Sequence, residues 1–142
     1  MGQDGLGRFV QAQDEGGTYP TALAELRRGR KVSHWMWFVF PQLAGLGRSS
    51  TARYFAIGSL TEAEAYLTHP VLGPRLLEAS RVVAGLRDRT AEDVFGSVDA
   101  LKLRSSMTLF ARVAPQEPVF TAVLERYFDG LPDDATEALL DR

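Results

Sequence analysis

The chain of 142 residues contains no cysteine and only two histidines, His34 and His69. The lack of cysteine excludes disulfides and thiolate-bound metals, and the lack of histidine excludes a histidine-rich metal centre. Carboxylates alone remain as metal ligands, and nothing in the sequence supports such a site. We therefore expect neither a metal nor a bound cofactor.

Long apolar runs and an excess of charge are also missing. The longest unbroken apolar run, Trp35 to Phe40, is too short to span a bilayer. Met1–Gly7 lacks the basic start and the apolar stretch that mark a secretory signal. The formal net charge of −2 gives no overall field that would attract nucleic acid or an anionic membrane. We therefore expect a cytoplasmic protein that binds neither.

What is present is the composition of an ordinary globular domain. The chain is 45% hydrophobic and 24% charged, and it has no repeat and no linker that would divide it. A domain of this size removes roughly 68–70% of the surface of its unfolded chain from water. We expect one domain over residues 1–142, with an ordered core from about residue 6 to residue 140.

Turn and cap signals divide the chain into short pieces, most of which have helical rather than strand periodicity. This pattern predicts an all-α fold, a compact domain of about seven short-to-medium helices. The longer pieces are expected at about residues 6–16, 19–28, 61–69, 71–86, 97–110 and 118–128. Shorter helical pieces are expected at about 34–40, 90–96 and 134–140.

Three local patterns predict where helices begin. Ser33 can cap a short helix through the aromatic residues that follow it. The pair Thr61 and Glu64 fits a capping box, and Asp134 with Glu137 repeats that spacing. Each pattern supplies a side-chain acceptor for the free backbone N–H groups of a first helical turn.

The segment from His34 to Gln42, His-Trp-Met-Trp-Phe-Val-Phe-Pro-Gln, holds both tryptophans and is apolar on every side. A contiguous exposed patch of Trp and Phe would promote association. We therefore expect the segment in the middle of the core, in a pocket wall or in a partner interface. A short helix that ends at Pro41 is expected, with a buried strand as the alternative.

Two further segments have both an ordinary and a functional interpretation. The segment Gln42–Ser50 reads as a loop whose glycines permit positive φ, either a plain turn or a backbone cradle for phosphate. The basic residues Arg27, Arg28, Arg30 and Lys31 form either a solvated helix end or an anion site. We favour the ordinary interpretation of both.

The helix expected from Asp99 to Phe110 places Asp99, Lys102, Ser105 and Ser106 on one face. If that face meets water, the helix is merely amphipathic. If it lines a cleft, Lys102 and the two hydroxyls could bind a ligand, and a serine could act as nucleophile with Lys102 as base. The order Lys-x-x-Ser-Ser differs from the motif of β-lactam-binding enzymes, in which the serine precedes the lysine.

Five blocks of the sequence together resemble one family. The blocks are His-Trp-Met-Trp-Phe-Val-Phe-Pro-Gln, the loop pair Leu46-Gly47, residues 64–70 with Tyr-Leu-x-His-Pro, Leu-Gly-Pro-Arg-Leu at 72–76, and Asp-x-x-Lys-Leu-x-Ser-Ser-Met-Thr-Leu-Phe at 99–110. Over about residues 8–140 the chain resembles the bacterial domain-of-unknown-function family 1810, sometimes labelled calpastatin. The resemblance implies a compact, mainly helical fold, but no reaction and no catalytic residues. The calpastatin label does not fit, because that inhibitor is disordered and repetitive.

A fainter similarity links the chain to helical domains that process ADP-ribose derivatives. Those domains also present an aromatic-rich segment near the start and a lysine-containing helix before a phenylalanine-rich one. By this analogy a nucleotide-like ligand would stack on Trp35 or Trp37, and its phosphates would meet Lys102 and Arg75. His34 would then transfer a proton.

Two functions from different classes follow. The first, which we favour, is a pocket for a small molecule such as a nucleotide or an ADP-ribose-like compound, with catalysis left open. Its binding residues would be Trp35, Trp37, Gln42, Arg75, Lys102, Ser105 and Ser106, with His34 and Lys102 as candidate catalytic residues. The second is a non-enzymatic protein-interaction or self-association module that uses the aromatic segment. The sequence does not determine the ligand, a reaction or the oligomeric state.

Overall fold

The helices begin and end close to the local signals in the sequence. The structure is a computed structural model that describes residues 4–142. Within these residues the α-helices are α1 (Gly7–Asp14), α2 (Thr18–Arg27), α3 (Met36–Val39), α4 (Ser50–Tyr54), α5 (Leu60–Thr68), α6 (Leu72–Gly85), α7 (Ala91–Val113), α8 (Pro118–Phe128) and α9 (Asp134–Leu140). Two 3₁₀ turns, η1 (Asp4–Leu6) and η2 (Glu15–Gly17), flank α1. The first residues of the expected domain, 1–3, lie outside the described residues.

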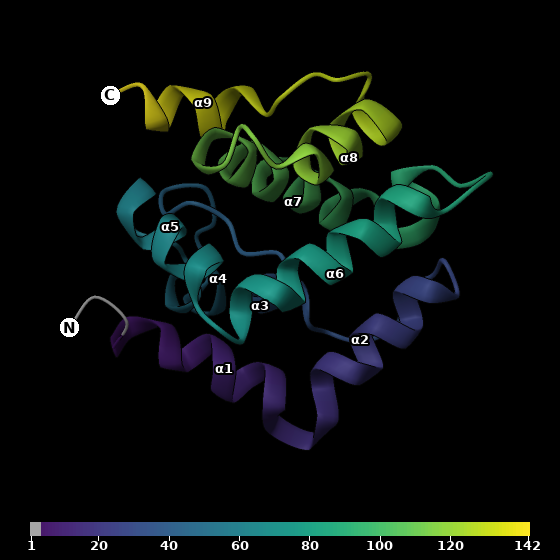
Figure 1. Cartoon of the computed structure of the whole chain (residues 1–142), viewed down its shortest axis with the longest axis horizontal. Helices are drawn as coiled ribbons and strands as arrows, with labels where there is room; N and C mark the ends of the chain where they lie inside the picture. Colours follow the sequence, from purple (N-terminus) through teal and green to yellow (C-terminus); the bar gives the residue numbers. More distant parts are fainter. Residues whose placement is uncertain (1–3) are drawn as a thin grey trace.

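The helices lie in layers across the molecule (Figure 1). α1 and α2 form one edge, α8 and α9 form the opposite edge, and α6 and α7 lie between them. The described residues contain one strand-like pairing, a β-bridge between Leu43 and Ile57. The predicted all-α fold in a single compact domain is therefore confirmed. None of the helices in residues 4–142 combines the length and apolar character needed to cross a membrane.

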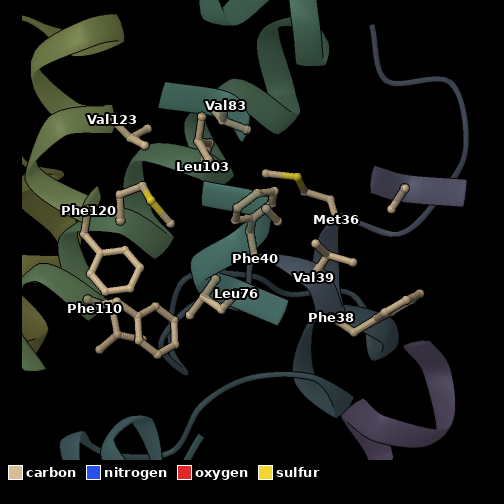
Figure 2. Packing of buried hydrophobic residues seen from close by; sticks show 14 of the residues in the cluster. Met36, Phe38, Val39, Phe40, Leu76, Val83, Leu103, Phe110, Phe120 and Val123 are labelled. Atoms are coloured by element: carbon tan, nitrogen blue, oxygen red, sulfur yellow. The ribbon is translucent and has the colours of Figure 1, made fainter. Parts of the chain in front are cut away.

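The aromatic segment lies in the middle of the core, the first of the three expected places. Trp35 and Phe40 have no exposed surface, and the short helix α3 forms between them as predicted. Figure 2 shows Phe40 among side chains from its own segment, α6 and α7. The rings of Phe110 and Phe120, from α7 and α8, lie 5.8 Å apart at the side of this cluster. Buried aromatic rings of this size make a large contribution to the stability of the core.

α7 joins the two helices that were expected at 90–96 and 97–110. Thr90 and Asp93 form a reciprocal capping box at its start. Gly96 interrupts the helix with a φ of 80° and a ψ of 165°, a conformation that glycine adopts without steric cost. The break redirects the chain, and the long segment after it carries Asp99 and Lys102. The short helix α4, capped by Ser49, was not predicted.

The predicted start of α5 is wrong by two residues. The cap is Ser59, whose hydroxyl accepts a hydrogen bond from the N–H of Glu62 at 3.1 Å, and not Thr61. The Glu62 carboxylate in turn accepts from the N–H of Gly58 at 2.8 Å. Ser59 and Glu62 have the same spacing as Thr61 and Glu64, so the local pattern fits both positions.

The predicted start of α9 is wrong by one residue. The cap is Asp133, whose Oδ2 accepts from the N–H of Thr136 at 2.9 Å, and not Asp134. The N–H of Asp133 donates to Oγ1 of Thr108 on α7 at 2.8 Å. This contact between helices fixes the residue at which α9 begins, and no local pattern could indicate it.

Replacement of Gly73 by alanine should destabilise the fold. A Cβ at this position would overlap the backbone carbonyl oxygen of Leu67, at the close approach of α6 to α5. Because a backbone atom cannot rotate away, Gly73→Ala should lower the free energy of unfolding by about 1–3 kcal/mol, the usual cost of overpacking. Urea denaturation followed by circular dichroism measures this change.

Gly85→Ala is the matched control on the same helix. Apart from its chain neighbours and the backbone of its own helix, no described atom lies within 4 Å of a Cβ at Gly85, so this variant should be neutral or more stable by up to about 1 kcal/mol. If Gly73→Ala were as stable as Gly85→Ala, the close approach of α5 and α6 would be refuted.

Candidate functional site

A buried carboxylate fixes the chain that leads into the aromatic segment. Glu25 lies on α2 with 3% of its surface exposed. Its Oε1 accepts from the N–H of Val32 at 2.8 Å, from the N–H of Ser33 at 2.9 Å and from Nε1 of Trp35 at 2.9 Å. Its Oε2 accepts from the Ser33 hydroxyl at 2.6 Å. The prediction that Ser33 caps α3 is therefore wrong, because this hydroxyl is bound to Glu25 instead.

These hydrogen bonds keep Glu25 ionised. Burial alone would raise the pKa of the carboxyl, but the hydrogen bonds from Ser33, Val32 and Trp35 lower it to about 2. None of the sequence patterns predicted a role for this residue. The sequence does indicate it indirectly, because Glu25 is a charged residue at helical spacing from the apolar residues Ala22 and Leu26, on the face of α2 that packs against the core.

Two lysines share one carboxylate beside this anchor. Nζ of Lys31 lies 2.9 Å from Oδ2 of Asp99, and Nζ of Lys102 lies 3.2 Å from Oδ1 of the same group. We call Lys31, Asp99 and Lys102 the ion cluster. Lys31 also donates to the carbonyl of Ser33 at 2.6 Å. Lys31 is therefore an exception to the prediction that the basic residues 27–31 form a solvated helix end. The side chains of Lys31 and Lys102 are 8% and 21% exposed.

Each ammonium group of the ion cluster faces an indole ring. Nζ of Lys31 lies 5.1 Å from the ring centroid of Trp35, and Nζ of Lys102 lies 4.6 Å from that of Trp37. Both distances are within the range of a cation–π attraction, which is stronger where water is partly excluded. The structure therefore brings the aromatic segment and the helix of Lys102 together.

Lys102 also lines an open groove on the surface. The groove has a volume of about 270 Å³. It is lined by Gln42, Leu46 and Gly47 from the loop after α3, by Val98, Leu101, Lys102 and Ser105 from α7, and by Asp133 and Ala135 at the start of α9. We call it the Lys102 groove. It unites three of the predicted binding residues, namely Gln42, Lys102 and Ser105, with the predicted glycine loop.

The wall that α9 adds to the groove is held by a chain of hydroxyl groups. Oγ1 of Thr136 donates to Oδ2 of Asp133 at 2.6 Å, and it lies 2.9 Å from Oγ of Ser105. Because the only hydroxyl proton of Thr136 is used toward Asp133, Ser105 is the donor to Thr136. The proton of Ser105 therefore points to a threonine and not to an amine or an imidazole. In this arrangement Ser105 positions α9 against α7.

Three other predicted residues do not line the Lys102 groove, and two of them, Trp35 and Ser106, are part of the interior. Trp35 is fully buried, so its ring faces offer no surface for a ligand to stack on. Ser106 is also fully buried, and its hydroxyl has no hydrogen-bond partner among the described residues. Trp37 is partly buried and meets the groove only through its contact with Lys102.

The two remaining predicted residues lie elsewhere. Arg75 on α6 forms an ion pair with Asp14 at 2.8 Å, donates to Gln13 at 3.2 Å and lies over the ring of Tyr19 at 5.0 Å. His34 is exposed and does not line the groove. Lys102 and Arg75 therefore do not form a joint phosphate clamp.

The described residues contain no group of three His, Asp or Glu side chains arranged to hold a metal ion. Among the described residues that line it, the groove offers one ammonium group and one amide as polar contacts, while the Ser105 hydroxyl is bound to Thr136 and Asp133 is the cap of α9. This set can bind an anionic or polar ligand.

Comparison with known proteins places the chain among proteins without an assigned activity. The family described as "Protein of unknown function (DUF1810)" matches residues 3–140. The crystal structure of the conserved hypothetical protein Rv1873 from Mycobacterium tuberculosis is similar, with 51% sequence identity, a TM-score of 0.93 and 96% of each chain covered. The search of curated proteins gives no match.

Replacement of Glu25 by glutamine should change how stability depends on pH. A carboxyl whose pKa falls from 4.5 to about 2 on folding adds stability above pH 4.5, and this stability is lost as the pH falls toward 2. We expect Glu25→Gln to be less stable than the parent protein by about 3 kcal/mol above pH 5, since one pKa unit corresponds to about 1.4 kcal/mol. The difference should shrink between pH 4.5 and pH 2.

Urea denaturation at a series of pH values measures this difference. Glu64→Gln, at an exposed position on α5, is the matched control and should stay close to the parent protein throughout. A gap between Glu25→Gln and the parent that remained constant from pH 7 to pH 2 would contradict the depressed pKa.

Proposed function

The chain belongs to the DUF1810 family of proteins of unknown function, and we propose that the Lys102 groove is a binding site for a small molecule with an anionic group. Binding sites for small molecules are concave and mostly apolar, with a few polar groups at fixed positions. The Lys102 groove has this character. The proposal concerns binding and includes no reaction.

The observation that carries the proposal is the charge of the ion cluster. Two ammonium groups, of Lys31 and Lys102, share the single carboxylate of Asp99 and leave one positive charge in excess. Lys31 alone would neutralise Asp99, and Lys31 is the more buried of the two lysines. A second, partly buried ammonium group at the wall of a groove adds little to stability and is well placed to meet an anion.

Gln42 and Ser105 support the same interpretation. Gln42 follows the buried Pro41 and lines the groove together with Lys102. Its amide can donate to one oxygen of a carboxylate or a phosphate while Lys102 binds another. Ser105 contributes through the wall of the groove and not through a ligand contact, because it is 2% exposed and its hydroxyl donates to Thr136.

A nucleotide or an ADP-ribose-like compound is one form that such a ligand could take. Of the residues expected for it, Lys102 lines the groove, Trp35 is inside the core, and Arg75 is paired with Asp14. The nucleotide hypothesis therefore depends on Lys102 for the phosphate and on the partly buried ring of Trp37 for stacking with the base.

The alternative of an interaction module that uses the aromatic segment has less support. Trp35 and Phe40 are fully buried, and Phe38 is 9% exposed. A segment that is already part of the core has little surface left for a partner. The exposed apolar side chains near the site belong to α7 instead, where Val98 and Leu101 are 65% and 62% exposed.

Binding can be followed through Trp37, because its ring contacts Lys102. We expect at least one compound from a collection of anionic, zwitterionic and neutral metabolites to change the tryptophan emission. Trp37→Phe should lose the response, since Trp35 is buried and bound to Glu25. Isothermal titration calorimetry gives the affinity independently of fluorescence.

Lys102→Met should weaken binding of that compound by at least about tenfold, which corresponds to 1.4 kcal/mol. The melting temperature should stay within a few degrees of the parent value, because Lys31 still pairs with Asp99. Arg48→Gln removes the same charge from an exposed residue that does not line the groove, and it should bind as the parent does. The proposal fails if no compound binds, or if Lys102→Met and Arg48→Gln bind equally well.

A further inference from the structure

The structure also narrows the class of ligand. We infer that the Lys102 groove takes an amphipathic compound with a single negative charge, a carboxylate that bears an apolar chain. This inference rests on the proposed function and goes beyond it, because an anion site could equally have been built for a polyphosphate.

The charged side chains at the groove favour a ligand with a single anionic group. The ionisable side chains that line the groove are Lys102 and Asp133, and Lys102 belongs to a cluster with one positive charge in excess. Asp133 balances this excess, so the attraction for an anion is local, and Lys102 at the wall can pair with one anionic group of the ligand. Each additional negative charge would lie near Asp133 without a cation to compensate it, and repulsion between like charges is strong where water is partly excluded.

Among the described residues, no second cation lines the groove, and this supports the same conclusion. Arg75 is held by Asp14 and Gln13. Arg104, two residues after Lys102, donates to the carbonyl of Leu131 at 2.9 Å and lies over the ring of Phe128. Neither arginine lines the groove. Recognition of several phosphate groups commonly uses bidentate arginines, and the groove offers none.

The apolar wall beside Lys102 favours a ligand with an apolar chain. Val98 and Leu101 lie three residues apart on the same face of α7, and both are more than 60% exposed. They line the groove with Leu46 on the opposite loop. Exposed aliphatic side chains that flank a single, partly buried ammonium group match a ligand with an apolar chain and one charged end.

The volume of the groove favours a small ligand. At about 270 Å³ the groove lies just below the range of roughly 300–1,000 Å³ that is usual for sites of drug-sized ligands. A carboxylate with a chain of a few carbons fits a groove of this volume. A dinucleotide would extend well outside it and would meet solvent over most of its surface.

Four probes at constant ionic strength test the inference by titration under nuclear magnetic resonance. Hexanoate has both features, acetate lacks the apolar chain, hexanol lacks the charge, and ADP carries several charges. We expect hexanoate to bind at least about tenfold more tightly than each of the other three. The shifted resonances should include those of Leu46, Val98, Leu101 and Lys102.

Variants separate the two contributions. Lys102→Met should weaken hexanoate binding by at least about tenfold and leave hexanol unaffected. Leu101→Ser should weaken hexanoate by at least about fivefold and leave acetate unaffected, and it should fold normally because the side chain is exposed. Arg48→Gln is the control for charge and should bind all four probes as the parent does.

The outcomes distinguish this inference from the proposed function. If ADP binds more tightly than hexanoate in a manner that depends on Lys102, the ligand class is wrong and the binding site stands. If Leu101→Ser converts a dimeric protein to a monomer in size-exclusion chromatography, the apolar wall is a self-association surface and the inference is overturned. If none of the probes or metabolites binds, both proposals fall.

Discussion

The ionised carboxylate of Glu25 is the constraint on which the arrangement around the groove depends. A charge at a buried position is tolerated only where hydrogen bonds replace the water that it loses. Glu25 receives four such bonds from Val32, Ser33 and Trp35, and these fix the chain between α2 and α3 residue by residue. The position of the aromatic segment follows from this anchor, because Trp35 is both a donor to Glu25 and a fully buried part of the core.

A second polar anchor holds the other end of α3. The carbonyl of Phe38 accepts from Nε2 of Gln13 at 2.8 Å and from the hydroxyl of Tyr66 at 3.2 Å. Burial raises the pKa of Tyr66, so this hydroxyl keeps its proton and remains a donor. Arg75 donates to the amide oxygen of Gln13 and so completes the network. A helix of four residues has no stability of its own, and these contacts explain why α3 forms. They also engage Arg75, for which the sequence predicts a contact with phosphate.

The geometry of the groove is a consequence of the two anchors. With Trp35 and Trp37 fixed, each indole has a lysine against its face, and the two lysines meet at Asp99. The break at Gly96 turns α7 so that Asp99 and Lys102 approach the aromatic segment. Lys102 is thus held at the wall of the groove by residues that are not part of it. The charge proposed to meet a ligand is set by a network whose main purpose is structural.

The sequence by itself determined the fold class, most of the helices and the central place of the aromatic segment, because caps, glycines, prolines and apolar periodicity act over a few residues. It also indicated Lys102, Ser105 and Gln42, which the structure brings to one groove. Local patterns could not distinguish Ser59 from Thr61 as a cap, and they could not show that Glu25 binds Trp35 or that Ser105 donates to Thr136, 31 positions away. Those pairings, and the separation of Arg75 and His34 from the groove, were decided only by the tertiary structure. The physical reason is that a side chain's partner depends on how whole helices pack, and this packing depends on contacts between residues far apart in the chain.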